Sequence, residues 1–351
     1  MKVLLLNPQI PDYRIHIYNL IGEKLDLTIA HTGRFREEKG VNFKQILLNI
    51  NKIGPFLYYP INLHKLCNKY DIIISEGDIH YIDRNILILS PFRKYKWITW
   101  GIGVSASYNK KFDQDKRFDY IRNFIFKKAN AQVFYSDYPV YKHINAGFKK
   151  ASLFVANNTT FVNFDEKKRF EKHKLLFVGT LYKQKRIYEL LESYLEYCKS
   201  NPNCIPLEII GDGDELQNIS NWIYTNGLVE KIKLHGAIFN HAILEQHFRE
   251  ALACISPGQA GLSVLTSMGY GTPFITKKDA ITGGEIFNIE NGVNGVLYEN
   301  SGELANILKD IQENKKKYVE MGISARNHYL KNRKPEQMMQ GIIDACYYVL
   351  K

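Results

Sequence analysis

The chain has 351 residues, of which 45% are hydrophobic and 24% are charged, so its length and composition predict about two ordinary globular domains. No run of 18 or more apolar residues is present, which excludes a membrane-spanning helix. The formal net charge of +11 falls entirely in the first part of the chain, because residues 1–150 hold 24 Lys and Arg against 13 Asp and Glu.

This uneven charge bears on the class of partner. A basic surface on the first domain would suit an anionic membrane, a pyrophosphate-linked acceptor or a nucleic acid, and a merely solvated surface is the alternative. The cysteines are scattered and do not have the spacing of metal ligands. We therefore expect separate reduced thiols in the cytosol, each a small core or surface residue: Cys67, Cys198, Cys204, Cys254 and Cys346.

The chain opens with the apolar run Lys2–Leu6, which is too short for a signal peptide and predicts a first strand. A loop follows, and a helix is expected from Ile15 to Glu23. Asp12 could be a base or acceptor ligand, or a helix N-cap. Arg14 could contact an anion, or be a surface charge. The loop after a first strand lies at the ligand-binding edge of an open α/β sheet.

Alternating strands and helices in the first half predict a parallel sheet covered on both faces. Glu76, Gly101 and Gly103 follow two of the expected strands, where strand ends should face a cleft, and a helix is expected over Tyr120–Lys128. The expected strands after the first are Asp26–Ala30, Asp71–Ser75, Ile86–Leu89, Trp97–Trp100, Ala131–Tyr135 and Ser152–Val155.

The stretch Lys110–Lys150 mixes basic pairs with aromatic residues, a pattern that can mark an interfacial helix lying on a membrane. A nucleic-acid partner is not expected, because no recognisable nucleic-acid module accompanies the charge. The pairs are Lys110–Lys111, Lys116–Arg117, Lys127–Lys128 and Lys149–Lys150, and the aromatic residues are Phe112, Phe118, Phe124 and Phe126.

A polar, charge-dense segment from Asn157 to Lys174 predicts a linker, after which a second Rossmann-like domain begins. Its first strand leads into Gly179, then Lys185, then an amphipathic helix. A lysine beside such a turn is usually solvated.

The segment Gly211–Glu215 follows the next expected strand, Pro206–Ile210. Its Gly-x-Gly is a weak dinucleotide signal, and Asp212 with Asp214 could suggest a metal-binding pair. We favour a turn and helix start. The histidines show no metal-ligand cluster, and Ser263 lacks the second glycine of a nucleophile elbow, so neither a metal site nor a hydrolase is expected.

The stretch Leu252–Thr276 predicts strand, glycine loop, helix and strand, with the helix over Ser263–Gly269. The N-terminus of such a helix favours an anion, and Ala260 and Gly261 would let a diphosphate approach the backbone. An ordinary tight turn is the alternative. Glu285 follows later, either as a donor contact or as a helix cap.

The segment Gly261–Pro273, GLSVLTSMGYGTP, resembles the donor-site signature of the GT-B glycosyltransferases called family 4, which use nucleotide-activated sugars. The family's usual form has two glutamates, at positions that correspond here to Gly258 and Thr266. Its diphosphate-binding arginine corresponds to Thr180, for which Lys183 or Arg186 might compensate, and its lysine to Lys185. A histidine common near Gly101 is replaced by Ile102.

The resemblance implies an α/β GT-B architecture of two Rossmann-like domains whose parallel sheets face across a cleft. The acceptor-binding domain would span residues 1–165 and the donor-binding domain residues 166–335, with a helix over 336–351 packing back on the first. The implied donor-binding residues are Gly179, Thr180, Lys185, Arg186, Gly258, Gln259, Ala260, Gly261, Leu262, Ser263, Thr266 and Glu285, and the implied acceptor-side residues are Asp12, Arg14, Glu76, Gly101 and Gly103.

The expected function is transfer of a hexose from a UDP- or GDP-sugar to a glycan or lipid-linked oligosaccharide in surface polysaccharide synthesis. The transfer would be retaining and metal-independent, with Lys185 and Asp12 as catalytic candidates and no cofactor besides the donor substrate. The protein would be cytoplasmic, peripheral on the inner face of the plasma membrane. Two alternatives stay open: a nucleotide-sugar epimerase of the same fold, and a catalytically silent glycosyltransferase-like binding subunit.

Overall fold

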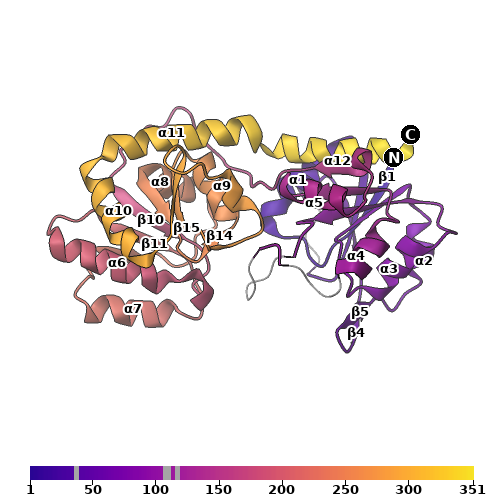
Figure 1. Ribbon diagram of the computed structural model, residues 1–351, viewed down its shortest axis with the longest axis horizontal. Helices are drawn as coiled ribbons and strands as arrows, with labels where there is room; N and C mark the ends of the chain where they lie inside the picture. The colour runs from indigo at the N-terminus through magenta and orange to yellow at the C-terminus, as the bar shows by residue number, and fades with distance from the viewer. Residues whose placement is uncertain (35–38, 106–111, 115–118) are drawn as a thin grey trace. The chain divides into compact units, whose positions relative to one another are not determined.

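The computed structural model describes residues 1–34, 39–105, 112–114 and 119–351, which form two compact units (Figure 1). The N-terminal unit comprises Met1–Ser105, Asp113–Phe161 and Lys334–Lys351, and the C-terminal unit is built from Val162–Arg333. None of the described helices is long and apolar enough to cross a membrane.

The N-terminal unit is organised around a parallel sheet whose described strands follow the order β3-β2-β1-β6-β7-β8-β9. Its central strands are buried on both faces, as a covered parallel sheet requires. The strands are β1 (Lys2–Leu6), β2 (Asp26–His31), β3 (Lys44–Leu47), β6 (Ile72–Ser75), β7 (Lys96–Gly101), β8 (Ala131–Phe134) and β9 (Leu153–Val155), beside the antiparallel hairpin of β4 (Asn51–Ile53) and β5 (Phe56–Tyr58).

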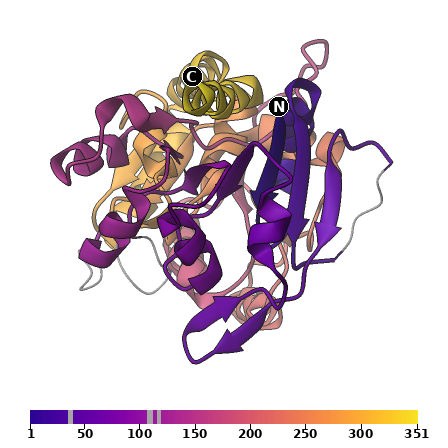
Figure 2. The same ribbon diagram turned by 90° about the vertical axis from the view of Figure 1, so that its right-hand side faces the viewer.

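Helices cover both faces of this sheet. One apolar core lies under α1 (Asp12–Lys24) and α12 (Pro335–Leu350), and another lies under α2 (Leu63–Cys67), α3 (Ile82–Leu89) and α4 (Asp119–Phe126). The last helix therefore belongs to the first unit, and the two chain termini lie close together there (Figures 1 and 2). The remaining helical segments are α5 (Tyr138–Asn145) and η1 (Lys150–Ser152).

The C-terminal unit has a second parallel sheet, whose described strands follow the order β12-β11-β10-β13-β15-β17. The strands are β10 (Lys174–Val178), β11 (Leu207–Ile210), β12 (Ile232–Leu234), β13 (Ala251–Ile255), β15 (Phe274–Lys277) and β17 (Gly295–Tyr298), and a short parallel pair is formed by β14 (Gln259–Ala260) and β16 (Ile281–Thr282).

Here too each face of the sheet has its own core. Helices α6 (Ile187–Ser200), α7 (Leu216–Thr225) and α10 (Ser301–Glu313) cover one face, and α8 (His241–Glu250), α9 (Leu262–Gly269) and α11 (Lys315–Asn332) cover the other. A capping box between Asn300 and Glu303 starts α10, and Pro335 occupies the first turn of α12. Two 3₁₀ turns complete the unit, η2 (Lys183–Lys185) and η3 (Glu285–Asn288).

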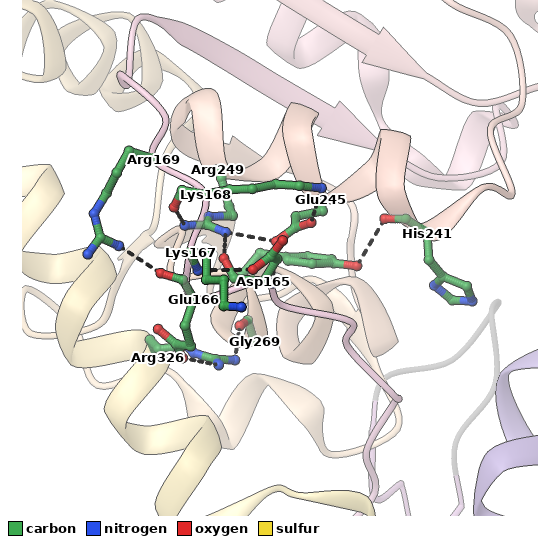
Figure 3. Close-up of polar contacts among 11 residues, drawn as sticks. Asp165, Glu166, Lys167, Lys168, Arg169, His241, Glu245, Arg249, Gly269 and Arg326 are labelled. Atoms are coloured by element: carbon green, nitrogen blue, oxygen red, sulfur yellow. Dashed lines mark hydrogen bonds and ion pairs between the residues drawn. The ribbon is translucent and has the colours of Figure 1, made fainter.

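The charged segment between the units is fixed onto the C-terminal unit by α8 (Figure 3). The Glu245 carboxylate, 1% exposed, accepts from the Asp165 backbone N–H at 2.7 Å. Arg249 donates to that carboxylate at 2.8 Å and to the carbonyls of Asp165 and Lys168 at 2.6 Å each. Its guanidinium also lies 4.0 Å from the centre of the Phe164 ring. The charge-dense segment predicted to be a linker therefore contacts the C-terminal unit from Asp165 onward.

Three sequence-based expectations are wrong. Ile86–Leu89 is the end of helix α3, not a strand, because Ile86 and Leu89 are exposed whereas Leu87 and Ile88 are buried, a helical rather than a uniform pattern. Cys198 and Cys204 are not separate thiols but form a disulfide between α6 and the following loop, with Cα atoms 5.3 Å apart. Arg14 is not a surface charge, since only 4% of it is exposed.

Some predictions were incomplete or lie elsewhere. The sequence did not indicate β3, the β4–β5 hairpin or the β14–β16 pair, which are short strands without long apolar runs. The predicted bases Lys110–Lys111 and Lys116–Arg117, with Phe118, lie outside the described residues.

Candidate anion-binding site

The candidate site lies in the C-terminal unit, at the carboxyl ends of the neighbouring strands β10 and β13. After β10 the chain passes Gly179, whose N–H donates to the Ile210 carbonyl at 3.0 Å, and then forms η2. Arg186 ends η2 with φ 51° and ψ 39°, the left-handed conformation that residues other than glycine seldom adopt. The chain changes direction at Arg186, α6 begins at the next residue, and the side chain of Lys185 is buried.

Lys185 is the unusual residue of this turn. It is 7% exposed, and its ammonium lies against Gly179, where a Cβ atom would stand 2.9 Å from Nζ. Among the residues that the structure describes, no hydrogen-bond acceptor or carboxylate pairs with this ammonium. Burial lowers the pKa of Lys185 to about 8. A charge this poorly solvated would gain strongly from an anion placed beside it.

Two glycines of the next loop allow it to pack closely against this turn. A Cβ atom on Gly211 would stand 1.9 Å from the Gly179 carbonyl oxygen, and one on Gly213 would stand 2.4 Å from that of Leu181. The Leu181 N–H donates in return to the Asp212 carbonyl at 2.9 Å. The Gly-Asp-Gly sequence therefore forms a packing turn before α7, in line with the turn and helix start that we favoured.

The loop from β13 to α9 closes against the same turn at Gly258. Its N–H donates to the Lys185 carbonyl at 3.0 Å, and its carbonyl accepts from the Ile281 N–H at 2.9 Å. A Cβ atom on Gly258 would stand 2.2 Å from the Gln184 carbonyl oxygen. Backbone occupies the space of any side chain here, so a glutamate at this position would not fit without displacing the Lys185 turn.

Helix α9 presents an uncapped N-terminus. Gly261 is the N-cap residue and has no side chain to accept from the first N–H groups, which belong to Leu262 and Ser263. The Ser263 hydroxyl is buried and has no hydrogen-bond partner among the described residues. Free amide donors, an unsatisfied hydroxyl and the positive end of the helix dipole together favour an anionic ligand.

The other predicted donor residues surround these groups. Ala260 is buried in β14, and Gln259 beside it accepts from the Tyr182 hydroxyl at 2.6 Å. The Thr266 hydroxyl bonds within its helix to the Leu262 carbonyl at 3.1 Å. The Glu285 carboxylate is 7% exposed and accepts from the Gly283 N–H at 2.9 Å, an arrangement that orders its own loop.

Thr180, which stands where the family has its arginine, is exposed, and so are Lys183 and Arg186, the two residues that might compensate. Arg186 already pairs with Asp279, with Nη1 3.0 Å from Oδ1. Sequence reasoning missed Tyr182 and Asp279, which hold the turn to β14 and to the loop before β16. In the sequence, the only sign of their role is that Tyr182 lies near Lys185 and Asp279 lies near Ile281.

The acceptor-side candidates lie in the N-terminal unit. Glu76 follows β6, Gly101 is the last residue of the paired strand β7, and the two lie close together, because a Cβ atom on Gly101 would stand 3.9 Å from the Glu76 Cγ atom. Gly103 has φ 78°, and a side chain there would meet Phe134 at 2.4 Å. Asp12 is the exposed first residue of α1, after the N-cap position Pro11.

Arg14 is held deep in the same unit. Its guanidinium donates to Asn158 Oδ1 at 2.6 Å and to Met338 Sδ at 2.9 Å, and it lies 5.0 Å from the centre of the Tyr135 ring. These contacts link α1 to the segment that follows β9 and to α12, so Arg14 has a structural role.

A separate cluster, Glu208, His235 and His247, has the composition of a metal site, with ligand atoms within 4.8 Å of one another. Lys174 Nζ, however, lies 2.8 Å from Glu208 Oε2 and 2.7 Å from Glu250 Oε2. Burial opposes ionisation of Glu208, but hydrogen bonds from His247 and Lys174 lower its pKa to about 2. The Lys174 ammonium already supplies the positive charge that a metal ion would bring. The cluster is also separate from the candidate site, because Lys174 begins β10 whereas the Gly179 turn follows the other end of that strand.

The chain is similar to known proteins both in sequence and in structure. Residues 158–328 match the family described as glycosyl transferases group 1. No curated protein sequence matches the chain significantly. Among solved structures, a glycosyltransferase from Rickettsia africae has a TM-score of 0.75 at 16% identity, covering 100% of this chain and 98% of that one.

Two further structures are similar. Anabaena HepE in complex with UDP-glucose has a TM-score of 0.72 at 15% identity, and sucrose-phosphate synthase from Thermosynechococcus elongatus has 0.70 at 15%, each covering 99% of both chains. The likeness confirms the predicted GT-B fold, and the family match identifies residues 158–328 as a glycosyltransferase domain, in agreement with the expected enzyme class.

Proposed function

We propose that this glycosyltransferase moves a sugar from a nucleotide-sugar to a glycan or lipid-linked oligosaccharide in surface polysaccharide synthesis. UDP is the first nucleotide to test. The observation that carries the donor assignment is the buried ammonium of Lys185, unpaired among the described residues, in the turn that packs on the loop leading to α9. The complexes of HepE with UDP and with UDP-glucose support the same ligand class.

Chemically, the bond between the anomeric carbon and the diphosphate oxygen breaks as the acceptor oxygen bonds to that carbon. Negative charge grows on the leaving diphosphate, and preorganised donors at the Gly261–Ser263 helix start, with Lys185, would stabilise it without a metal. The acceptor oxygen would approach the anomeric carbon on the face from which the phosphate departs and pass its proton to the departing phosphate oxygen, so the transfer would be retaining. The residues that resemble the family 4 signature support this mechanism, and the absent glutamates leave the hydroxyls of the donor sugar to other groups.

The acceptor assignment depends on the N-terminal unit. Its charge excess and the adjoining Glu76 and Gly101 support an acceptor carried on a membrane, so the protein would act as a peripheral enzyme at the inner face of the plasma membrane.

The decisive experiment is a thermal-shift screen of nucleotide-sugars, followed by mass spectrometry of products with lipid-linked acceptors. A ligand that binds the folded state raises the melting temperature, and the stabilising donor should lose its sugar to the acceptor. Recovery of an epimerised nucleotide-sugar, or binding without turnover of any acceptor, would contradict the proposal in favour of an epimerase or a silent subunit.

A further inference from the structure

Helix α3 buries two polar residues, Arg84 and Asn85, and exposes three of its five apolar residues, whereas Leu87 and Ile88 face the core. Arg84 is 1% exposed, with its guanidinium 3.7 Å from the centre of the Tyr81 ring, and Asn85 is 7% exposed. Ile86, by contrast, is 59% exposed and Leu89 is 42% exposed. A helix of a soluble protein usually has the opposite arrangement, so the outer face of α3 is suited to a second, apolar environment.

Helix α4 packs beside α3 and extends this surface (Figure 1). Tyr120 is 81% exposed, Ile121 48% and Phe124 54%. Phe92, which follows α3, is 83% exposed, and the next residue, Arg93, donates to the Lys128 carbonyl just after α4 at 2.5 Å. We call the following set the apolar patch: Ile86, Leu89, Phe92, Tyr120, Ile121 and Phe124.

The border of the apolar patch is basic. Lys94 and Lys96 follow Phe92 and are exposed, as are Lys127 and Lys128 at the end of α4. Two carboxylates lie on the same helices: Asp119 pairs with Arg122 at 3.3 Å, and the Asp83 carboxylate accepts from the Tyr59 N–H at 2.7 Å. The four lysines outnumber these two carboxylates, so the summed charge of these described residues is positive.

We propose that the apolar patch docks on an anionic lipid bilayer, with its aromatic and aliphatic side chains in the headgroup boundary and its lysines on lipid phosphates. Exposed aromatic residues beside lysines are the combination that binds such interfaces, and charge complementarity favours a bilayer over an uncharged protein surface. This inference deepens the proposed function, on which it rests for a membrane-borne acceptor, by naming the surface that meets the membrane.

The test is co-sedimentation of the full chain with vesicles of phosphatidylcholine, with and without phosphatidylglycerol. The wild-type protein should bind the anionic vesicles. Phe92→Ser should lower its partition coefficient about tenfold, as expected for withdrawing one phenyl group from the boundary. Phe239→Ser is the matched control, since Phe239 is 84% exposed but lies in the C-terminal unit, and it should leave binding unchanged.

Charge reversal tests the lysines. Lys94→Glu with Lys128→Glu should reduce binding by at least about tenfold, whereas Lys315→Glu with Lys316→Glu, on exposed positions of α11, should not. Equal binding of wild type and Phe92→Ser, or equal binding to neutral and anionic vesicles, would overturn the proposal. A wild-type dimer that Phe92→Ser converts to a monomer would overturn it in favour of self-association. Nucleotide-sugar stabilisation, measured without vesicles, reports separately on the proposed function.

Discussion

Two lysines of the C-terminal unit lose most of their hydration but differ in their partners. Lys172 donates to the Ala251 carbonyl at 2.8 Å and to the Thr272 hydroxyl at 3.3 Å, whereas Lys185 makes no comparable bond among the described residues. Burial lowers both pKa values, to about 7 for Lys172 and about 8 for Lys185. The bonds of Lys172 to the backbone compensate its burial, whereas nothing among the described residues compensates that of Lys185, as expected of a group that binds an anionic ligand.

Replacing Lys185 with methionine should therefore stabilise the free protein while removing donor binding. The pKa of Lys185 is below that of an unfolded lysine, so its charge opposes folding at neutral pH, by about 3 kcal/mol. Denaturant titration should show this gain, and the thermal shift with nucleotide-sugar and the turnover should both fall sharply. Lys172→Met is the control, which should keep the ligand response. A Lys185 variant with unchanged turnover would refute the assignment.

The same pKa sets a pH dependence. Below about pH 8 the ammonium is charged and attracts the diphosphate, and above it the free protein holds a neutral amine. The dissociation constant of the nucleotide-sugar should be flat at lower pH and should then rise, approaching tenfold per pH unit, until the pKa of the complex is reached. Calorimetric titration from pH 6.5 to pH 9.5 measures this. A Lys185→Met profile with the same rise would show that another group is responsible.

Gly258 should tolerate no side chain. Gly258→Ala places a methyl group against the Gln184 carbonyl, so either the Lys185 turn moves or the fold loses stability, by about 1–3 kcal/mol. Gly302→Ala is the matched control, because nothing lies within 4 Å of its Cβ position in helix α10. It should be neutral or stabilising in chemical denaturation. A Gly258→Glu variant with full activity would disprove this explanation of the missing glutamate.

At the scale of elements, α8 fixes the entry into the C-terminal unit. Glu245 and Arg249 each bond to the backbone of residues 165–168 (Figure 3). The Arg326 guanidinium of α11 lies over the Phe164 ring, 3.9 Å from its centre. These bonds satisfy backbone groups of an irregular segment, which burial would otherwise leave without partners. The path of the chain into β10 is thus set by side chains about 80 residues further along.

Arg249→Met should destabilise the protein by about 3 kcal/mol, because it leaves the buried Glu245 carboxylate without its main partner. The double variant Glu245→Gln with Arg249→Met should recover part of that loss, since the unpaired charge is then absent. Free energies of unfolding from the four members of this cycle measure the coupling. Additive losses would mean that the two side chains act independently.

Most strands and long helices could be predicted from the sequence because apolar runs and helical periodicity reflect burial directly. That reasoning fails at Ile86–Leu89, because a short apolar run fits either a buried strand or a helix. Here the run belongs to a helix that exposes Ile86 and Leu89. Arg14 defeats it differently: its partners Asn158 and Met338 are 144 and 324 residues away in the chain. At the candidate site, the lysine and the glycines were predictable, but the isolation of the Lys185 ammonium depends on three loops that only the folded unit brings together.

At the scale of the whole molecule, the last helix completes the first unit. Met338, Ile342 and Val349 of α12 enter the same apolar core as Ile17 of α1. Gly341 allows the close approach, because a Cβ atom there would stand 2.2 Å from the Val155 carbonyl oxygen. The two units are therefore not consecutive along the chain, although each has its own sheet and cores.

Deleting residues 334–351 should unfold the N-terminal unit but spare the other. The truncated chain should lose protease resistance across residues 1–161, while the fragment from Val162 onward survives digestion and still responds to nucleotide-sugar. Limited proteolysis with mass spectrometry measures this, and removal of Lys351 alone is the control. Protection of residues 1–161 in the truncated chain would show that α12 is dispensable.

The return of α12 also sets the order in which a newly made chain can mature. The strands of the first sheet are synthesised before residues 162–333, yet the helix that covers one face of that sheet is synthesised after them. Residues 162–333 have all their elements earlier and can fold while synthesis continues. Residues 1–161 must wait with apolar surface uncovered, which makes them the stretch where chaperones would bind nascent chains.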